Sequence, residues 1–422
     1  AGWLLSIGQT SAVKEVLAVL DSQEALPMLW RASLSDDANE RQQFIAAAEH
    51  CHAHNVRFPN SLDEVQMLQS LGDSAFARYL LGCFWYSKRR YDEAVSCWRE
   101  TLEKSPDYAP AHRLLGVYSW NKQQDATQAL AYLQSAVALE PDNARFLFEL
   151  DFLQKLLARP VHERLTTLVE RKAVVLKRDD LTAELLSLWN ASGHYADAAA
   201  ILDTRVFHPW EGGEGKITGQ YLLNQLHRAL QFIERGAFKQ ATDCLKAALR
   251  YPDNLGEGRL PGQTDNDIWY LLGYCAEQAG DAQQAAEYYQ LARQGGSTLD
   301  AGRYYNDQPA DYLFWQGIAL RKSGNPAQAE QHFRHFIDWA AQHRDDVPQV
   351  DFFAVSLPDL VVLDVSAQQR HQQHCLFIEA LGHLGLGNVS ACQQRMQQLL
   401  QINPAHDKAH LIRHALQSGI FS

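Results

Sequence analysis

Basic residues are the scarcer charge in this sequence. The 422 residues include 38 Lys and Arg against 50 Asp and Glu, which gives a formal net charge of −12. Binding to nucleic acid or to an anionic membrane surface requires a basic face, so this balance argues against both kinds of partner. Helix breakers are also few, with 14 Pro and 25 Gly, and their scarcity over so long a chain favours helix.

Two further absences narrow the class of protein. No apolar run approaches the roughly 20 residues that a membrane span needs. The start, AGWLLSIGQT, lacks the basic region of a signal peptide, and we interpret a chain that begins Ala-Gly as a segment of a longer protein. The seven cysteines are odd in number and no two have C-x-x-C spacing, which predicts reduced thiols in a cytoplasmic protein.

A repeat of 34 residues runs along the chain. In the segment AFARYLLGCFWYSKRRYDEAVSCWRETLEKSP, Gly82 precedes Trp98. Gly116 follows Gly82 by 34 residues, and its unit continues to Pro141 with one inserted residue. We predict that each unit is two antiparallel helices. The small residue lets the two backbones approach, the large residue fills the space beside it, and the proline ends the second helix.

Further copies follow in the same register. The clearest is NDIWYLLGYCAEQAGDAQQAAEYYQLARQ, and another covers residues 310–336. A weaker copy spans residues 222–255, the last spans 373–406, and a degenerate hairpin fits at 181–205. Between about 143 and 178 the helical spacing persists but the signature is lost. Several matches at the correct offsets make an unrelated helical bundle the weaker alternative.

These units resemble the tetratricopeptide repeat, and the resemblance implies an all-α fold, a right-handed α-solenoid with irregular inserted loops. Residues 1–74 are predicted to form four short helices that cap one end of the solenoid, the last of them opened by a capping box at Ser61–Glu64. Residues 75–205 form the first half of the repeats. Residues 206–422 are predicted to hold repeats with long inserts and a closing C-terminal helix, and the whole chain is predicted to be one continuous solenoid.

Four inserts interrupt the repeats, at residues 206–219, 252–265, 300–309 and 348–366. Their aromatic residues either fasten the loops to the helices or face a ligand, because loops on rigid scaffolds often carry binding residues. The strings FHPWEGGEGKITGQY, YPDNLGEGRL, YYNDQP and DFFAVSLPDL resemble a group of large bacterial tetratricopeptide-repeat proteins. In that group the repeats follow an N-terminal β-rich region with a galactose-mutarotase-like sandwich, which implies a link to carbohydrate metabolism.

The inserts supply the residues that we predict to bind a ligand or partner. These are His208, Trp210, Glu211, Glu214, Tyr304, Tyr305, Asn306, Asp307, Gln308 and Asp359. Paired carboxylates beside an aromatic ring suit sugar binding, and they equally suit a hydrated acidic loop. Loop residues three apart have no defined separation, so no catalytic residue is predicted, and GGEGK lacks the spacing of a phosphate-binding loop.

Histidine spacing raises the question of a metal site. His406, His410 and His414 lie at i, i+4 and i+8 of a predicted helix, which places the outer two about 12 Å apart. Zinc requires three or four converging ligands. We therefore interpret these residues as neutral surface histidines and predict neither a metal nor a cofactor.

The favoured hypothesis is a scaffold or binding module for a protein segment or for the N-terminal β-rich region of the same polypeptide. The alternative is a region that contributes to a carbohydrate-binding or carbohydrate-processing site, and a third reading is a structural spacer. The sequence leaves enzymatic activity open and favours none for this region alone.

Overall fold

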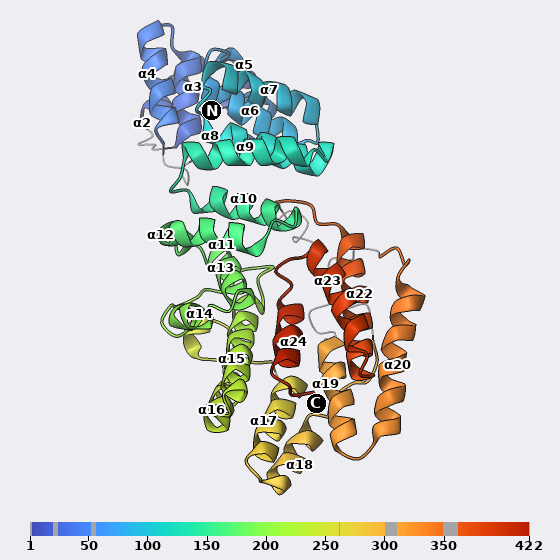
Figure 1. Cartoon of the computed structure of the whole chain (residues 1–422). Coiled ribbons are helices and arrows are strands. Elements are labelled where there is room, and N and C mark those ends of the chain that lie inside the picture. Colours follow the sequence, from blue (N-terminus) through green and yellow to red (C-terminus); the bar gives the residue numbers. More distant parts are fainter. Residues whose placement is uncertain are drawn as a thin grey trace. The chain divides into compact units, whose positions relative to one another are not determined.

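The computed structural model describes residues 2–19, 24–51, 56–260, 262–299, 310–348 and 362–421, and every regular element in this part of the chain is a helix (Figure 1). The predicted all-α fold is confirmed. Contacts divide the chain into two compact units, residues 1–146 and 147–422, with the boundary inside α10 (Ala144–Leu156). The predicted limits at 74/75 and 205/206, and the prediction of one continuous solenoid, stay predictions.

The first unit begins with short helices and continues with helix hairpins. Its helices are α1 (Gly2–Ser6), α2 (Thr10–Val19), α3 (Ala25–Leu34), α4 (Ala38–Glu49), α5 (Leu62–Ser70), α6 (Ala75–Ser87), α7 (Tyr91–Lys104), α8 (Ala109–Tyr118), the π-helix η2 (Ser119–Gln123) and α9 (Ala126–Leu139). The described part of residues 1–74 thus holds five helices rather than the predicted four. The extra break falls at Gly8, whose φ of 75° ends α1. The predicted capping box is present, with Ser61 and Glu64 bonded reciprocally.

The small and large residues of the repeat meet as predicted. A Cβ on Gly82 of α6 would lie 2.4 Å from Nε1 of Trp98 on α7, so the indole occupies the space that the glycine leaves. In the next hairpin the Leu133 side chain occupies the space beside Gly116 in the same way. Leu133 lies one position later in the chain than the Gly82–Trp98 spacing predicts. The π-helix η2, between Gly116 and Leu133, accommodates the inserted residue, because a π turn holds one residue more than an α turn.

The second unit is built mainly of paired helices. After α10 its elements are α11 (Val161–Glu170), α12 (Lys172–Val175), α13 (Asp179–Ala191), α14 (Tyr195–Leu202), α15 (Lys216–Glu234), α16 (Phe238–Ala248), the 3-10 turn η3 (Asp253–Leu255), α17 (Asn266–Gln278), α18 (Ala282–Leu291), α19 (Ala310–Lys322), α20 (Pro326–His343), α22 (Ala367–Gly385), α23 (Val389–Ile402) and α24 (Asp407–Gln417). Consecutive helices pack as hairpins, and each hairpin contacts the next, which is the arrangement of an α-solenoid.

The stretch that lacks the repeat signature is held by buried charges. Arg164 of α11 donates two hydrogen bonds to Asp151 of α10, at 2.9 and 2.7 Å, and one to Glu184 of α13 at 3.0 Å. Lys155 donates to the same glutamate at 2.8 Å. Burial alone raises the pKa of Glu184, but the two cations outweigh it and lower the pKa to about 2. These ion pairs join α10, α11 and α13 where the repeat residues are missing.

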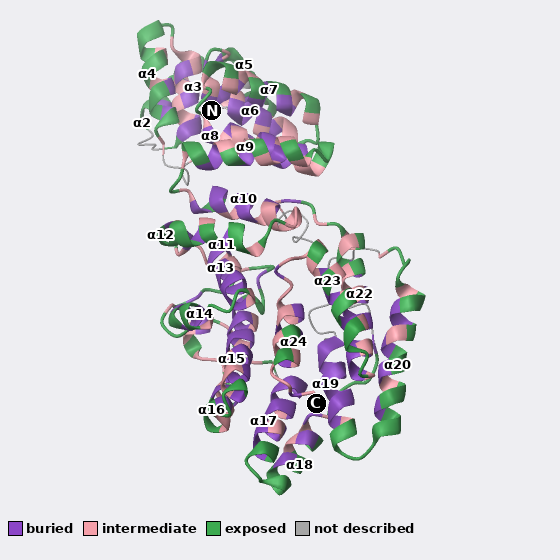
Figure 2. Cartoon of the chain, in the orientation of Figure 1, coloured by how far each residue is buried: buried purple, intermediate pink, exposed green. Residues whose placement is uncertain are grey.

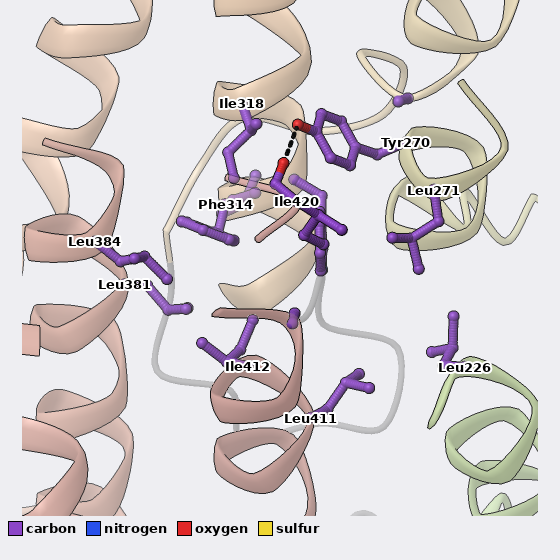
Figure 3. Packing of buried hydrophobic residues seen from close by; sticks show 14 of the residues in the cluster. Leu226, Tyr270, Leu271, Phe314, Ile318, Leu381, Leu384, Leu411, Ile412 and Ile420 are labelled. Carbon is purple, nitrogen blue, oxygen red and sulfur yellow. Dashed lines mark hydrogen bonds between the residues drawn. The ribbon is translucent and has the colours of Figure 1, made fainter. Parts of the chain in front are cut away.

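Buried residues occur along the helices of both units (Figure 2). In the first unit one core cluster holds apolar residues between Val13 and Leu115, and in the second unit one holds apolar residues between Leu223 and Ile420. In the second unit the core extends to the C-terminal helix. Figure 3 shows Leu411 and Ile412 of α24 among side chains of α15, α19 and α22. The seven cysteines are free thiols, as predicted, and burial raises the pKa of Cys83 to about 12 and that of Cys375 to about 11. Such thiols are poor nucleophiles.

Candidate functional site

Two of the four inserts pack against each other in the second unit. We call residues 205–218 together with residues 252–259 the insert cluster. The Phe207 N–H donates to the carbonyl of Asn254 at 2.8 Å, and the Asn254 amide donates to the carbonyls of Leu202 and Arg205, both at 2.8 Å. A Cβ on Gly256, whose φ is 80°, would lie 2.5 Å from the Phe207 carbonyl oxygen. Only glycine fits this close approach of the two loops.

A carboxylate at the start of α13 fixes the first insert. Asp179 accepts from Arg205 at 2.6 Å and from the His208 N–H at 2.9 Å. Burial alone raises the pKa of this carboxyl, but these hydrogen bonds and the Arg205 charge outweigh it, so the pKa lies below its ordinary value. Phe207 is buried, with the Arg205 guanidinium 5.3 Å from its ring centroid. Phe207 therefore fastens its loop to the rest of the unit and does not face a ligand.

A second carboxylate fixes the end of the insert. Glu257 accepts from the Gly215 N–H at 2.9 Å and from the Thr218 hydroxyl at 3.3 Å, so it satisfies donors at the N-terminus of α15. Neither Asp179 nor Glu257 was among the predicted residues. Their roles depend on partners 29 and 42 residues away along the chain, and no local pattern marks such pairs.

The structure brings four of the predicted binding residues together on this fixed loop. His208, Glu211 and Glu214 are exposed, and Trp210 is half-buried with its ring against Gly213 and the Lys216 ammonium 5.9 Å from its centroid. The other predicted residues, Tyr304, Tyr305, Asn306, Asp307, Gln308 and Asp359, lie outside the described residues. The assignment of a binding site to these positions stays a prediction.

The C-terminal helix occupies a place that the repeat pattern does not predict. Besides its neighbour α23, α24 contacts α13 and α15, which precede it by about two hundred residues, and Figure 1 shows it between α15 and α22. Ala409, Leu411, Ile412 and Ala415 are all buried. The predicted closing helix therefore exists, and it packs inside the second unit as well as on the last hairpin.

The three histidines of this helix are half-buried, and each makes a contact with other residues, which corrects the interpretation of them as surface residues. His406 caps α24 by accepting from the Ala409 N–H at 3.2 Å, and His410 hydrogen-bonds the Pro404 carbonyl at 2.8 Å. His414 lies 2.9 Å from His227, nitrogen to nitrogen. Burial lowers the pKa of these three histidines and of His227, to about 4 for His406. The lowered pKa keeps the rings neutral, as expected.

In the described ranges, no group of three or more His, Cys, Asp or Glu side chains converges as metal ligands would. Likewise, none of the helices given above combines the length and the apolar character that crossing a membrane would require.

Comparison with known proteins identifies the repeat. The family model of the tetratricopeptide repeat matches residues 85–144, in the first unit, and residues 226–302, in the second. The chain therefore contains tetratricopeptide repeats. Such repeats serve as protein-interaction scaffolds, and domains built from them bind protein partners.

Solved structures with similarity to this chain have low sequence identity to it. The pilus biogenesis factor PilW is 16% identical, with 51% of this chain and 90% of PilW covered and a TM-score of 0.27. The P58(IPK) TPR domain is 15% identical, with 82% and 99% covered and a TM-score of 0.24. The Naa15/Naa10 complex bound to HypK-THB is 14% identical, with 84% and 52% covered and a TM-score of 0.37.

Proposed function

We propose that this chain is a scaffold that binds a protein partner through the insert cluster. The observation that carries the proposal is the way the first insert is held. Its backbone is fixed by hydrogen bonds that Asp179 and Glu257 accept and by one that the Asn254 amide donates to Arg205, while His208 and Glu211 stay exposed on it. A loop whose backbone is already fixed and whose side chains are exposed loses little conformational entropy when it binds a partner.

The proposed partner is an N-terminal β-rich region of the same polypeptide. The resemblance of the insert strings to large bacterial repeat proteins supports this choice, since the inserts are the feature that distinguishes that group from other repeat proteins. The exposed acidic residues of the cluster and the net charge of −12 favour a basic or neutral contact face on the partner. Complementary charges of this kind act mainly on the association rate.

The experiment is a binding titration between this chain and the β-rich region, expressed separately, with rates measured at low and at moderate salt. Glu211→Lys should lower the association rate about threefold to tenfold at low salt and less at moderate salt. The control is Glu287→Lys, which makes the same charge change at an exposed position of α18. Equal effects of the two variants would remove the insert cluster from the interface.

A carbohydrate ligand is a second proposal, and it rests on Trp210 beside two exposed carboxylates. One side of the ring packs on Gly213 and Lys216 lies near it, so a sugar would have to stack on what remains exposed. Calorimetry with a panel of mono- and oligosaccharides tests the idea. A heat of binding that Trp210→Ala abolishes supports it, and silence across the panel contradicts it.

A further inference from the structure

The packing of α24 resembles that of a bound ligand more than that of a repeat helix. A repeat helix contacts its neighbours in sequence, whereas α24 contacts α13 and α15 in addition to α23. Only residues 403–406 join it to α23. We call residues 405–421 the C-terminal segment, and we call the side chains of α13, α15, α17, α19 and α22 that contact it the helix site.

Polar side chains of the helix site recognise the first turn of α24. Asp407 accepts from the Ser187 hydroxyl of α13 and from the Gln220 amide of α15, both at 2.7 Å. Behind them Gln220 accepts from Asn190 at 2.9 Å, and Asn190 accepts from Asn224 at 3.0 Å. These four side chains are buried, so the hydrogen bonds orient donors toward a single carboxylate in a water-poor setting.

Lys408, the second residue of α24, pairs with an acidic side chain of the helix site. The Lys408 ammonium lies 2.8 Å from Asp311 of α19 and 5.3 Å from the centroid of the Tyr312 ring. Asp311 and Asp267 are both nearly inaccessible, at 3% and 2% exposure. Removing the Lys408 ammonium would leave the Asp311 carboxylate buried without the opposite charge that contacts it. Burial raises the pKa of Asp267, and the Lys408 charge acts in the opposite direction.

The rest of the segment supplies an apolar face and an aromatic end. Leu411 and Ile412 face α15, α19 and α22 (Figure 3), and Phe421 packs on Phe314 and Trp315 with centroids 5.6 and 5.5 Å apart. The Tyr270 hydroxyl donates to the Ile420 carbonyl at 3.3 Å. The exposed side chain Arg413 lies on the opposite side of the helix.

We propose that the second unit contains a helix-binding site whose resident ligand is its own C-terminal segment. The site takes an amphipathic helix that begins with Asp-Lys, continues with an aliphatic face and ends on an aromatic residue. A partner helix of this chemistry and the C-terminal segment bind the same residues and so exclude each other. This site is separate from the insert cluster, and the proposal does not depend on the partner assigned to that cluster.

The test uses the full chain and a fluorescent peptide with the sequence of residues 403–421. The tethered segment acts at a high effective concentration, so the wild-type chain should bind the peptide weakly. Lys408→Glu in the chain replaces the cation that pairs with buried Asp311 by a second carboxylate and should loosen the resident segment. This variant should bind the wild-type peptide at least tenfold more tightly than the wild-type chain does, and the peptide should raise its melting temperature.

Two controls separate this result from general damage. Arg413→Glu makes the same charge change on the exposed side of α24 and should leave peptide binding as in the wild type. A peptide that itself carries Lys408→Glu should not bind the loosened chain. Equal binding of both peptides, or no binding by a Lys408→Glu chain that keeps its helical circular dichroism, overturns the proposal.

A second experiment covers the case in which Lys408→Glu does not fold. A protease site is inserted between Asn403 and His406 of the wild-type chain, and the folded protein is cut. The C-terminal segment should stay bound in gel filtration and be replaced by an excess of the labelled peptide. Immediate loss of the segment together with helical structure, or retention without any exchange, contradicts a ligand-like role.

Discussion

At the scale of single residues, the spacing of small and large side chains controls how closely paired helices approach. A Cβ on Gly273 of α17 would lie 2.6 Å from the Tyr289 ring of α18, nearer than side chains in folded proteins come. Gly273→Ala should therefore lower the free energy of unfolding by about 1–3 kcal/mol, measured by urea denaturation. Gly219→Ala, in α15 with open space around it, should change stability by less than about 1 kcal/mol and in the favourable direction.

If both alanines had the same effect, helix propensity and not the contact with Tyr289 would account for the change in stability. The pairing itself could be predicted from the sequence because both members recur at fixed offsets, as Gly82 with Trp98 and Gly317 with Phe333 do. The role of Phe207 could not, because its burial depends on Asn254 and Gly256 of another insert.

At the scale of single elements, α24 links stability to pH through its cap. The pKa of His406 is about 4, below its ordinary value, because burial disfavours the charged ring more than the neighbouring Asp407 favours it. His406 of the unfolded chain therefore binds a proton near pH 6.5, whereas His406 of the folded chain binds it only when the pH falls to about 4. The contribution of this residue to the free energy of unfolding is complete above the unfolded pKa and falls as the pH drops through this window.

His406→Asn tests this link and preserves the cap, since Asn also accepts from the N–H groups of a first helical turn. Between pH 7 and pH 5 the wild type should lose roughly 2 kcal/mol more stability than this variant, as measured by denaturation at both pH values. Parallel losses in the two proteins would show that the ring is accessible to protons in the folded state. Asn403→Ala, in the preceding linker, is a control that leaves the pH dependence unchanged.

Helices as elements were largely predictable from the sequence, and their long-range contacts were not. Hairpins such as α17 with α18 follow from local register, and the capping box at Ser61 follows from four adjacent residues. The position of α24 depends on Ser187 and Gln220, which nothing near residue 407 in the sequence indicates. For the same reason the histidine spacing was interpreted as a surface pattern, although His414 contacts Tyr195 of α14 and His227 of α15.

At the scale of the molecule, the C-terminal segment joins parts of the second unit that a simple stack of repeats would keep independent. In such a stack each repeat contacts only its neighbours, so a change in the last helix is felt in the helix beside it. Here Asp407 bonds Ser187 of α13 and Gln220 of α15, and Ser418 bonds Glu234 at 3.0 Å. Local opening of α24 should therefore also release α13 and α15.

Hydrogen exchange with the full chain measures this coupling. Asp407→Ala removes two hydrogen bonds to a charged acceptor, worth about 1.5–3 kcal/mol each, and leaves Ser187 and Gln220 buried without it. Amides of α13 and α15 should then exchange at least tenfold faster, together with those of α24, while those of α18 keep the wild-type rate. Arg413→Ala, on the exposed side of the same helix, should change none of these rates. Faster exchange confined to α23 and α24 would mean that the second unit behaves as a linear stack, in which the C-terminal helix stabilises only the hairpin it follows.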